Sequence, residues 1–175
     1  PDQQPNYPAA RSTPTVDGEQ VFAFGSDGDL ACLERVTGKV RWQKNVRKDY
    51  GGQPGIWAYS ESPLVDGEAV ICTPGGPDAT LVALNKNTGE LIWKCAVAGG
   101  EQASYASALA IEAGGVRQYI QMLQKGLVGV EAKTGKLLWR YDRTAKGSPA
   151  VIPTPVADGE FIYSAGARNG GGGVR

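Results

Sequence analysis

The stretch "NTGELIW" at residues 87–93 decides how this sequence is interpreted, because two other segments nearly repeat it. "VTGKVRW" occupies residues 36–42 and "KTGKLLW" occupies residues 133–139. Each copy has Trp four residues after the Gly of a Thr-Gly pair, and three of the four tryptophans lie in this frame. The Thr residues are 51 (88 − 37) and 46 (134 − 88) positions apart. Periods near 50 residues are typical of an array of one structural unit.

A second marker, Ser/Thr followed by Asp-Gly, alternates with the Thr-Gly pairs. It reads "STPTVDGEQVF" from Ser12, "SPLVDGEAVI" from Ser62 and "PTPVADGEFIY" from Pro153, with a weaker copy, "SALAIEAGGVRQYI", from Ser107. Asp-Gly between apolar runs predicts a tight β-hairpin. Thr-Gly predicts another turn, in which Gly allows a positive φ and the Thr hydroxyl bonds nearby backbone. Each unit therefore reads as four short strands.

The pattern within the units predicts an all-β fold. Residues 81–84 are continuously apolar, which indicates sheets covered on both faces. Four-stranded sheets in repeats of about 40–50 residues are the blades of a β-propeller. We predict a single domain, a partial β-propeller of four-stranded antiparallel blades over residues 1–175, from a ring of seven or eight blades. The expected three and a half blades are 11–47, 60–97, 104–143 and 151–175, the last incomplete.

Three segments allow another local structure. "EQASYASALAIEA" at 101–113 is rich in helix formers, but the repeat frame places a first strand at 107–111, and a helix across 104–112 would contradict that choice. "NGGGG" at 169–173 lacks the residues of a phosphate loop and is expected to be a flexible loop. "VRKDY" at 46–50 is expected to be a solvated loop.

Composition excludes several functional classes. The chain has no histidine, which excludes Ser-His-Asp and Cys-His catalysis and imidazole zinc sites. Its net charge is zero, from 18 basic and 18 acidic residues, so we predict no nucleic-acid binding. No apolar run approaches the roughly 20 residues of a membrane span, so we predict no membrane insertion. The cysteines Cys32, Cys72 and Cys95 lack CxxC spacing and are expected to be buried hydrophobes, although one disulfide is possible.

The repeated motif residues have a structural role in this interpretation. Each motif Trp should extend from an outer strand onto the neighbouring blade, where its indole N–H needs an acceptor. The structural motif residues are Thr37, Gly38, Trp42, Thr88, Gly89, Trp93, Thr134, Gly135 and Trp139. We assign no catalytic, cofactor-binding or metal-binding residue.

The pattern Asp/Asn/Glu-x-x-Thr-Gly-x-x-x-Trp resembles the tryptophan-docking motif of quinoprotein-type, pyrroloquinoline quinone (PQQ)-like propellers. The copies begin at Glu34, Asn85 and Glu131, where that family usually has Asp. The resemblance covers residues 11–175. One branch of the family, the PQQ dehydrogenases, has adjacent cysteines in a disulfide ring, a Trp under the quinone and an Asp base. Here no cysteines are adjacent and the only tryptophan outside the motif is Trp57, so no cofactor is expected.

The other branch resembles the propeller lipoprotein of the outer-membrane β-barrel assembly machinery. This resemblance implies a non-catalytic, protein-binding scaffold in an exported or membrane-associated bacterial protein, in the periplasm or cell envelope, with protein partners. One alternative is a fragment of a PQQ-dependent alcohol dehydrogenase with quinone and calcium. Another is the sensor domain of a larger membrane protein. No signal peptide is visible in this sequence, which begins at Pro1.

The longest connection between blades, residues 47–62, supplies the candidate binding residues. Loops carry function more often than scaffold strands do. Trp57, Tyr59 and Glu61 lie in this connection, and Arg11 precedes the first strand of the previous blade. We expect these four residues at the rim of the central channel. The competing interpretation is an ordered loop whose aromatic side chains cap the blade edge.

Overall fold

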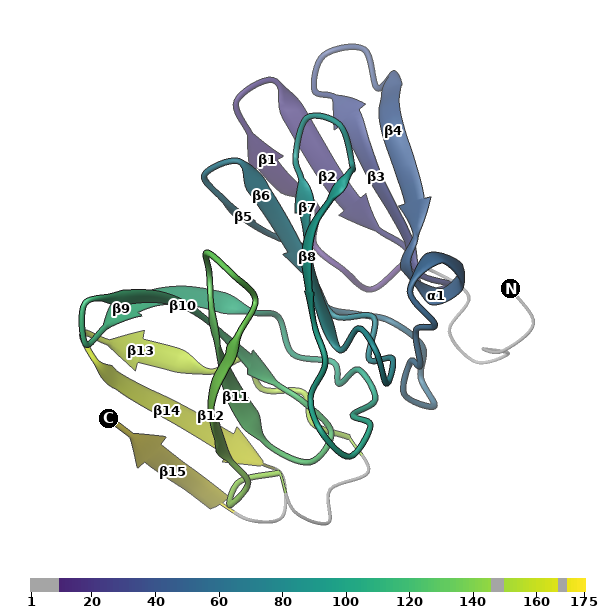
Figure 1. The fold of residues 1–175 in the computed structure, drawn as a ribbon. Coiled ribbons are helices and arrows are strands. Elements are labelled where there is room, and N and C mark those ends of the chain that lie inside the picture. The colour runs from purple at the N-terminus through teal and green to yellow at the C-terminus, as the bar shows by residue number, and fades with distance from the viewer. Residues whose placement is uncertain (1–9, 146–149, 167–169) are drawn as a thin grey trace.

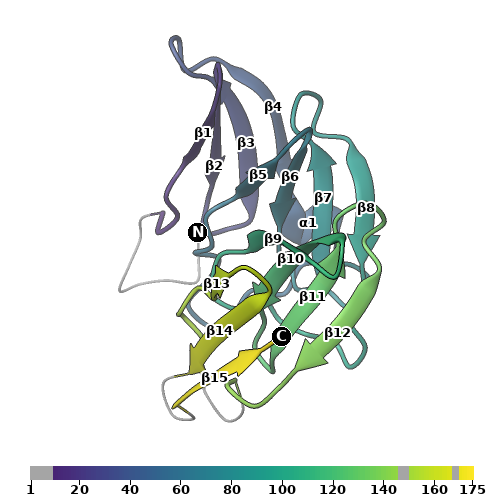
Figure 2. The ribbon, with the colours of Figure 1, turned by 90° about the vertical axis from the view of Figure 1, so that its left-hand side faces the viewer.

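The computed structural model describes residues 10–145, 150–166 and 170–175, and it folds them into four antiparallel sheets that form a fan (Figures 1 and 2). The strands of each sheet pair in chain order. This confirms the prediction of an all-β partial propeller built from four-stranded antiparallel blades. The sheets are numbered here from the N-terminus.

The strand bounds are as follows. The first sheet contains β1 (Thr15–Asp17), β2 (Gln20–Phe24), β3 (Asp29–Glu34) and β4 (Val40–Asn45). The second contains β5 (Leu64–Asp66), β6 (Ala69–Cys72), β7 (Leu81–Asn85) and β8 (Leu91–Cys95). The third contains β9 (Leu109–Ala113), β10 (Val116–Met122), β11 (Leu127–Glu131) and β12 (Leu137–Tyr141). The fourth contains β13 (Val156–Asp158), β14 (Phe161–Gly166) and β15 (Gly170–Val174).

A β-bulge occurs at the same place in each of the first three sheets. In the first sheet Cys32 pairs with Trp42 but the next residue, Leu33, pairs with Val40, so Arg41 is the extra residue. The third and second sheets shift register at the equivalent positions. The extra residue, immediately before Trp, is exposed in each case. Because a bulge redirects the following side chain, it lets the Trp point into the junction between sheets.

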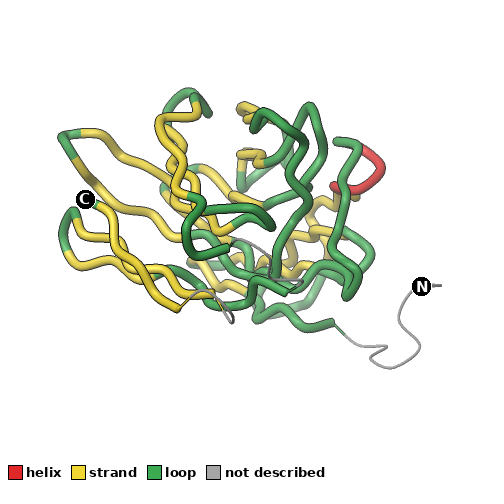
Figure 3. Tube along the Cα trace, turned by 90° about the horizontal axis from the view of Figure 1, so that it is seen from below, coloured by secondary structure: helices red, strands yellow, loops and turns green. Residues whose placement is uncertain are grey.

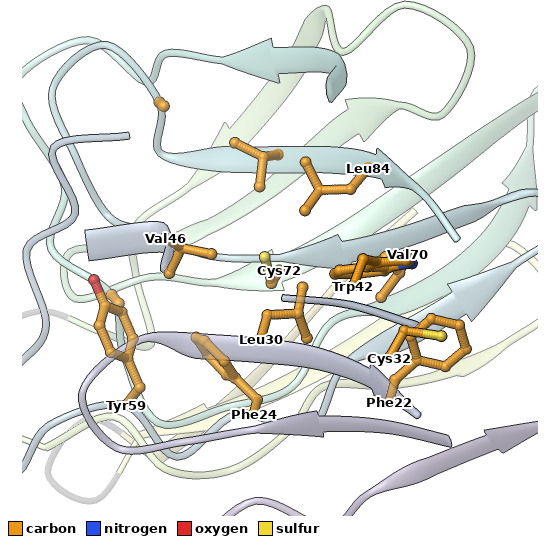
Figure 4. Close-up of a cluster of buried hydrophobic side chains, with 13 residues drawn as sticks. Phe22, Phe24, Leu30, Cys32, Trp42, Val46, Tyr59, Val70, Cys72 and Leu84 are labelled. Atoms are coloured by element: carbon orange, nitrogen blue, oxygen red, sulfur yellow. The ribbon is translucent and has the colours of Figure 1, made fainter. Parts of the chain in front are cut away.

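The core lies between the sheets. One cluster joins the first and second sheets through Phe22, Trp42, Val82 and Leu84 (Figure 4). Two further clusters join the second sheet to the third and the third to the fourth. All three cysteines are free and buried, and Figure 4 shows Cys32 and Cys72 among the apolar side chains.

Two sequence predictions were wrong and one local choice was confirmed. Residues 170–173 form part of strand β15, paired along β14, where a flexible loop was predicted; close approach of the Tyr163 hydroxyl leaves no room for a Cβ at Gly171. Residues 46–49 form the single helical turn α1 (Val46–Asp49), because the Asn45 side chain caps Lys48 N–H at 2.9 Å. The 104–112 segment contains no helix, and β9 begins at Leu109.

Figure 3 shows α1 as the one helix among the described residues, beside loops. This four-residue turn is far too short to cross a membrane, and none of the described segments forms a long apolar helix.

Candidate functional site

The repeated Trp residues join each sheet to the next. Trp42 of β4 reaches the second sheet, where its indole N–H donates to the Lys86 carbonyl at 2.9 Å. Its ring covers Gly89 so closely that a Cβ on that glycine would lie 2.7 Å from the ring. Trp93 repeats the arrangement with the Ala132 carbonyl at 2.9 Å and with Gly135. The Thr-Gly turn of one sheet is therefore the receptor for the Trp of the sheet before it.

Trp139 is placed differently. Its indole N–H donates to Gln118 Oε1 of its own sheet at 2.8 Å, and the ring is only partly buried. It lines a hollow of about 430 Å³ beside Ile162 of the fourth sheet.

A ladder of hydroxyl groups links the four first strands. The Thr13 N–H donates to Ser62 Oγ at 3.0 Å, the Ser62 N–H donates to Ser107 Oγ at 2.8 Å, and the Ser107 N–H donates to Thr154 Oγ1 at 3.1 Å. These four residues are the Ser/Thr of the second sequence marker. The hydroxyls of Ser62, Ser107 and Thr154 thus each hold the entry of one first strand against that of the preceding sheet, and the ladder fixes equivalent backbone positions of all four sheets side by side.

The residue two positions before each hydroxyl lines one shared hollow. These equivalent residues are Arg11, Ser60, Tyr105 and Ile152. Trp57 and Ala150 complete the lining of this hollow, which has a volume of about 420 Å³. We call the space that these six residues line the entry hollow. Its size lies within the range of about 300–1,000 Å³ that is usual for ligand sites.

The 53–61 segment positions the aromatic wall of the entry hollow. The Arg11 guanidinium donates to the Trp57 carbonyl, and the Trp57 N–H donates to the Tyr105 hydroxyl at 3.2 Å. The Trp57 and Tyr105 rings meet edge to face, with centroids 5.8 Å apart. Trp57 remains 38% exposed. Burial raises the pKa of Tyr105, so its hydroxyl stays protonated and keeps a proton to donate.

Tyr59 and Glu61 point away from the entry hollow and into the protein. Tyr59 is buried against Phe24, with ring centroids 5.2 Å apart, and its hydroxyl donates to the Pro74 carbonyl at 2.8 Å. Glu61 is 3% exposed, and its Oε1 accepts the Thr73 N–H at 2.5 Å. Burial raises the pKa of Glu61 to about 7, against the lowering effect of the Thr73 hydrogen bonds. Of the four rim candidates, the structure places Arg11 and Trp57 at the hollow.

Sequence reasoning missed Tyr105 and Ile152 as lining residues. The signal was present, because both occupy the position of Arg11 once the repeats are aligned on Thr13, Ser62, Ser107 and Thr154. No special residue type marks that position, since it holds Arg, Ser, Tyr and Ile in turn.

The described residues do not fit a quinone held over calcium. The lining of the entry hollow contains one cation, Arg11, and no carboxylate that could ligate calcium. Across the part of the chain that the structure describes, no three His, Cys, Asp or Glu side chains gather where a metal ion could be held.

Comparison with known proteins agrees with this geometry. A family model described as outer membrane protein assembly factor BamB matches residues 3–171. The chain belongs to this family. It is a PQQ-like repeat propeller, and the Trp and Thr-Gly contacts described above are its junctions between blades.

Similar proteins include both branches of the quinoprotein-type propellers. BamB from Moraxella catarrhalis has the same fold, with a TM-score of 0.65 and 16% identity, over 89% of this chain and 46% of that chain. A europium-containing methanol dehydrogenase matches with a TM-score of 0.54 and 14% identity, over 75% of this chain and 32% of that chain. The quinoprotein ethanol dehydrogenase of Pseudomonas aeruginosa is 34% identical over 74 residues, which are 42% of this chain and 12% of that protein. The chain therefore spans less than half of each of these proteins.

Proposed function

We propose that this chain is part of a non-catalytic, protein-binding scaffold in an exported protein of the bacterial cell envelope, and that a protein partner docks at the entry hollow. The family description, outer membrane protein assembly factor, supports the scaffold role and suggests partners from outer-membrane protein assembly. No cofactor is part of this proposal.

The observation that carries the proposal is the composition of the entry hollow. Four sheets contribute one equivalent residue each, and the 53–61 segment adds Trp57. Trp, Tyr and Arg dominate the binding energy of protein interfaces, and all three occur here around one hollow. Ile152, at 62% exposed, extends an apolar surface beside them. An anchoring side chain of a partner could be enclosed by these walls.

Site-specific photo-crosslinking in the full-length protein tests the proposal. A photoreactive amino acid replaces Trp57 or Ile152 in two variants and Ile92 in a control, since Ile92 is 48% exposed on the outer strand β8. We expect the first two variants to crosslink the same protein, at residues that form one surface, and the control not to crosslink it. Ile152→Asp should then weaken binding of the purified partner at least about tenfold, or about 1.4 kcal/mol. Equal crosslinking from position 92, or none from 57 and 152, would rule out the entry hollow as the docking site.

A second candidate function is a segment of a quinoprotein dehydrogenase. The identity of 34% to the Pseudomonas aeruginosa ethanol dehydrogenase favours it. Titration of the full-length protein with PQQ and calcium, followed by quinone absorbance and dye-linked alcohol oxidation, distinguishes the two. Stoichiometric binding with turnover would replace the scaffold proposal and assign the quinone site to residues outside this chain.

A further inference from the structure

Glu61 is a buried carboxyl with an unusual environment. Its Oε1 accepts the Thr73 N–H at 2.5 Å, just beyond the end of β6. Thr73 donates to it, and its charge would raise the pKa of Tyr59, in its own segment, and of Cys72, the last residue of β6. The nearby cation is Arg47 of α1, which acts on Tyr59. The Thr73 partner of Glu61 is a neutral group, and none of the groups named here is a cation that pairs directly with the carboxyl. A charged carboxylate at this buried position is therefore costly.

The repeat shows that packing does not require a carboxyl here. The position just before each ladder hydroxyl holds Ser12, Glu61, Ala106 and Pro153 in the four sheets. The other three residues are small or cyclic, and the strands of the sheets around them also pair in chain order. The carboxyl belongs to the second sheet alone, which is also the sheet entered through the 53–61 segment.

The 53–61 segment is strained as well as anchored. Ala58 has a φ of +64°, and it is the only residue other than glycine with a positive φ in the described part of the chain. A non-glycine residue in this region costs roughly 1–2 kcal/mol, so neighbouring contacts must hold it there. Those contacts are the burial of Tyr59 and the hydrogen bond of Glu61 on one side, and the Tyr105 hydroxyl at the Trp57 N–H on the other.

We propose that Glu61 is a proton-dependent latch for the 53–61 segment. With the carboxyl protonated, the segment is docked on β6 and Trp57 forms the wall of the entry hollow. Loss of the proton places a charge at this buried position, the strained segment loosens, and Trp57 changes position. The latch itself does not depend on the proposed function, but its consequence, control of partner docking, rests on that function. The pKa of about 7, raised by burial, puts the transition near neutral pH.

Three measurements on the partner-free, full-length protein test the latch. The emission of Trp57, obtained as the difference between the unaltered protein and Trp57→Phe, should shift with a midpoint between about pH 6 and 8. Glu61→Gln, which keeps the shape and remains neutral, should hold the low-pH spectrum throughout. Alkylation of the buried Cys72, read as its own peptide by mass spectrometry, should increase more above the midpoint in the unaltered protein than in Glu61→Gln.

Amide hydrogen exchange at Thr73 gives a readout that needs no variant. The amides of β7 serve as a reference for the ordinary rise of exchange rate with pH. Above the midpoint the exchange rate at Thr73 should increase by more than this reference. A constant Trp57 spectrum with unaccelerated Thr73 exchange would overturn the latch, as would an identical transition in Glu61→Gln. Because no partner is present in these assays, failure of the latch leaves the crosslinking test of the docking site unaffected.

Discussion

Replacing Trp93 with Ala should cost about 4 kcal/mol of unfolding free energy. The side chain is 8% exposed, and a buried Trp removes about 150–250 Å² from water, which contributes roughly 4–6 kcal/mol at about 25 cal/mol per Å². Its indole hydrogen bond to the Ala132 carbonyl adds about 1 kcal/mol. Side-chain entropy and a compact denatured chain reduce the sum, which leaves the range of about 3–5 kcal/mol usual for Trp→Ala in cores.

Two glycine variants distinguish the contribution of this docking contact from that of the turn conformation. Gly135 and Gly38 have φ of +74° and +70°, so Ala at either position carries about the same backbone cost of roughly 1–2 kcal/mol. A Cβ at Gly135 would lie 2.6 Å from the Trp93 ring, whereas a Cβ at Gly38 would meet nothing within 4 Å. We expect Gly135→Ala to lose about 1–3 kcal/mol more than Gly38→Ala, because only the first overpacks a contact.

Guanidinium chloride unfolding followed by circular dichroism measures these differences. Ile92→Ala is the matched control for Trp93→Ala, since it lies one residue earlier in β8 and is 48% exposed, and it should change stability by less than about 1 kcal/mol. In a Trp93→Ala background, Gly135→Ala should cost no more than Gly38→Ala does. A Trp93→Ala loss below about 1 kcal/mol, or equal losses for the two glycine variants, would refute the docking account.

Three further predictions concern the first strands and the 53–61 segment. Ala58→Gly should raise stability by about 0.5–1 kcal/mol in denaturant melts, because relief of the positive φ exceeds the entropy cost of Gly; a loss would show that Ala58 is unstrained. The raised pKa of Glu61 means that the folded chain holds more protons than the unfolded chain between about pH 4.5 and 7. Stability should therefore fall by about 3 kcal/mol as pH rises through this window, with the slope reduced in Glu61→Gln; an unchanged slope would assign it to other groups. Ser107→Ala removes the acceptor of the Ser62 N–H and should lower the free energy of unfolding by about 1 kcal/mol. Ser107→Thr keeps the hydroxyl and should lose less. Equal losses in the two variants would contradict the ladder.

The strands could be predicted because their signals are local. Asp-Gly marks the hairpins, in which Asp17 and Asp66 end their strands and the two-residue turns are 18–19 and 67–68. Thr-Gly with a following Trp marks the outer strands. The helical turn α1 was missed because it depends on one cap by Asn45. Strand β15 was missed because glycine has low strand propensity, and only the edge of β14 and the nearby Tyr163 give those glycines their structure.

The site could be predicted only in part, because it depends on which way each side chain points in the segment before a first strand. Of the four rim candidates, Arg11 and Trp57 lie at the entry hollow, while Tyr59 and Glu61 are buried. Successive residues of an extended chain point to opposite sides, and the change of backbone direction at Ala58 sets which side faces the hollow. A sequence does not show that change at an Ala, since a positive φ is expected at glycine.

The repeat divides its positions between holding the ring together and presenting a surface. Positions that join sheets have the same chemistry in different copies, as in the hydroxyl of Ser62 or Ser107 and the Thr-Gly turn beneath each docked Trp. The position two residues before the hydroxyl differs from copy to copy, and it is Arg11, Ser60, Tyr105 and Ile152 in turn. Substitution at that position should therefore alter the proposed docking surface while the ladder that joins the sheets stays in place. The same logic makes Glu61 informative, because it departs from the pattern at a buried position, where a change of residue usually costs stability.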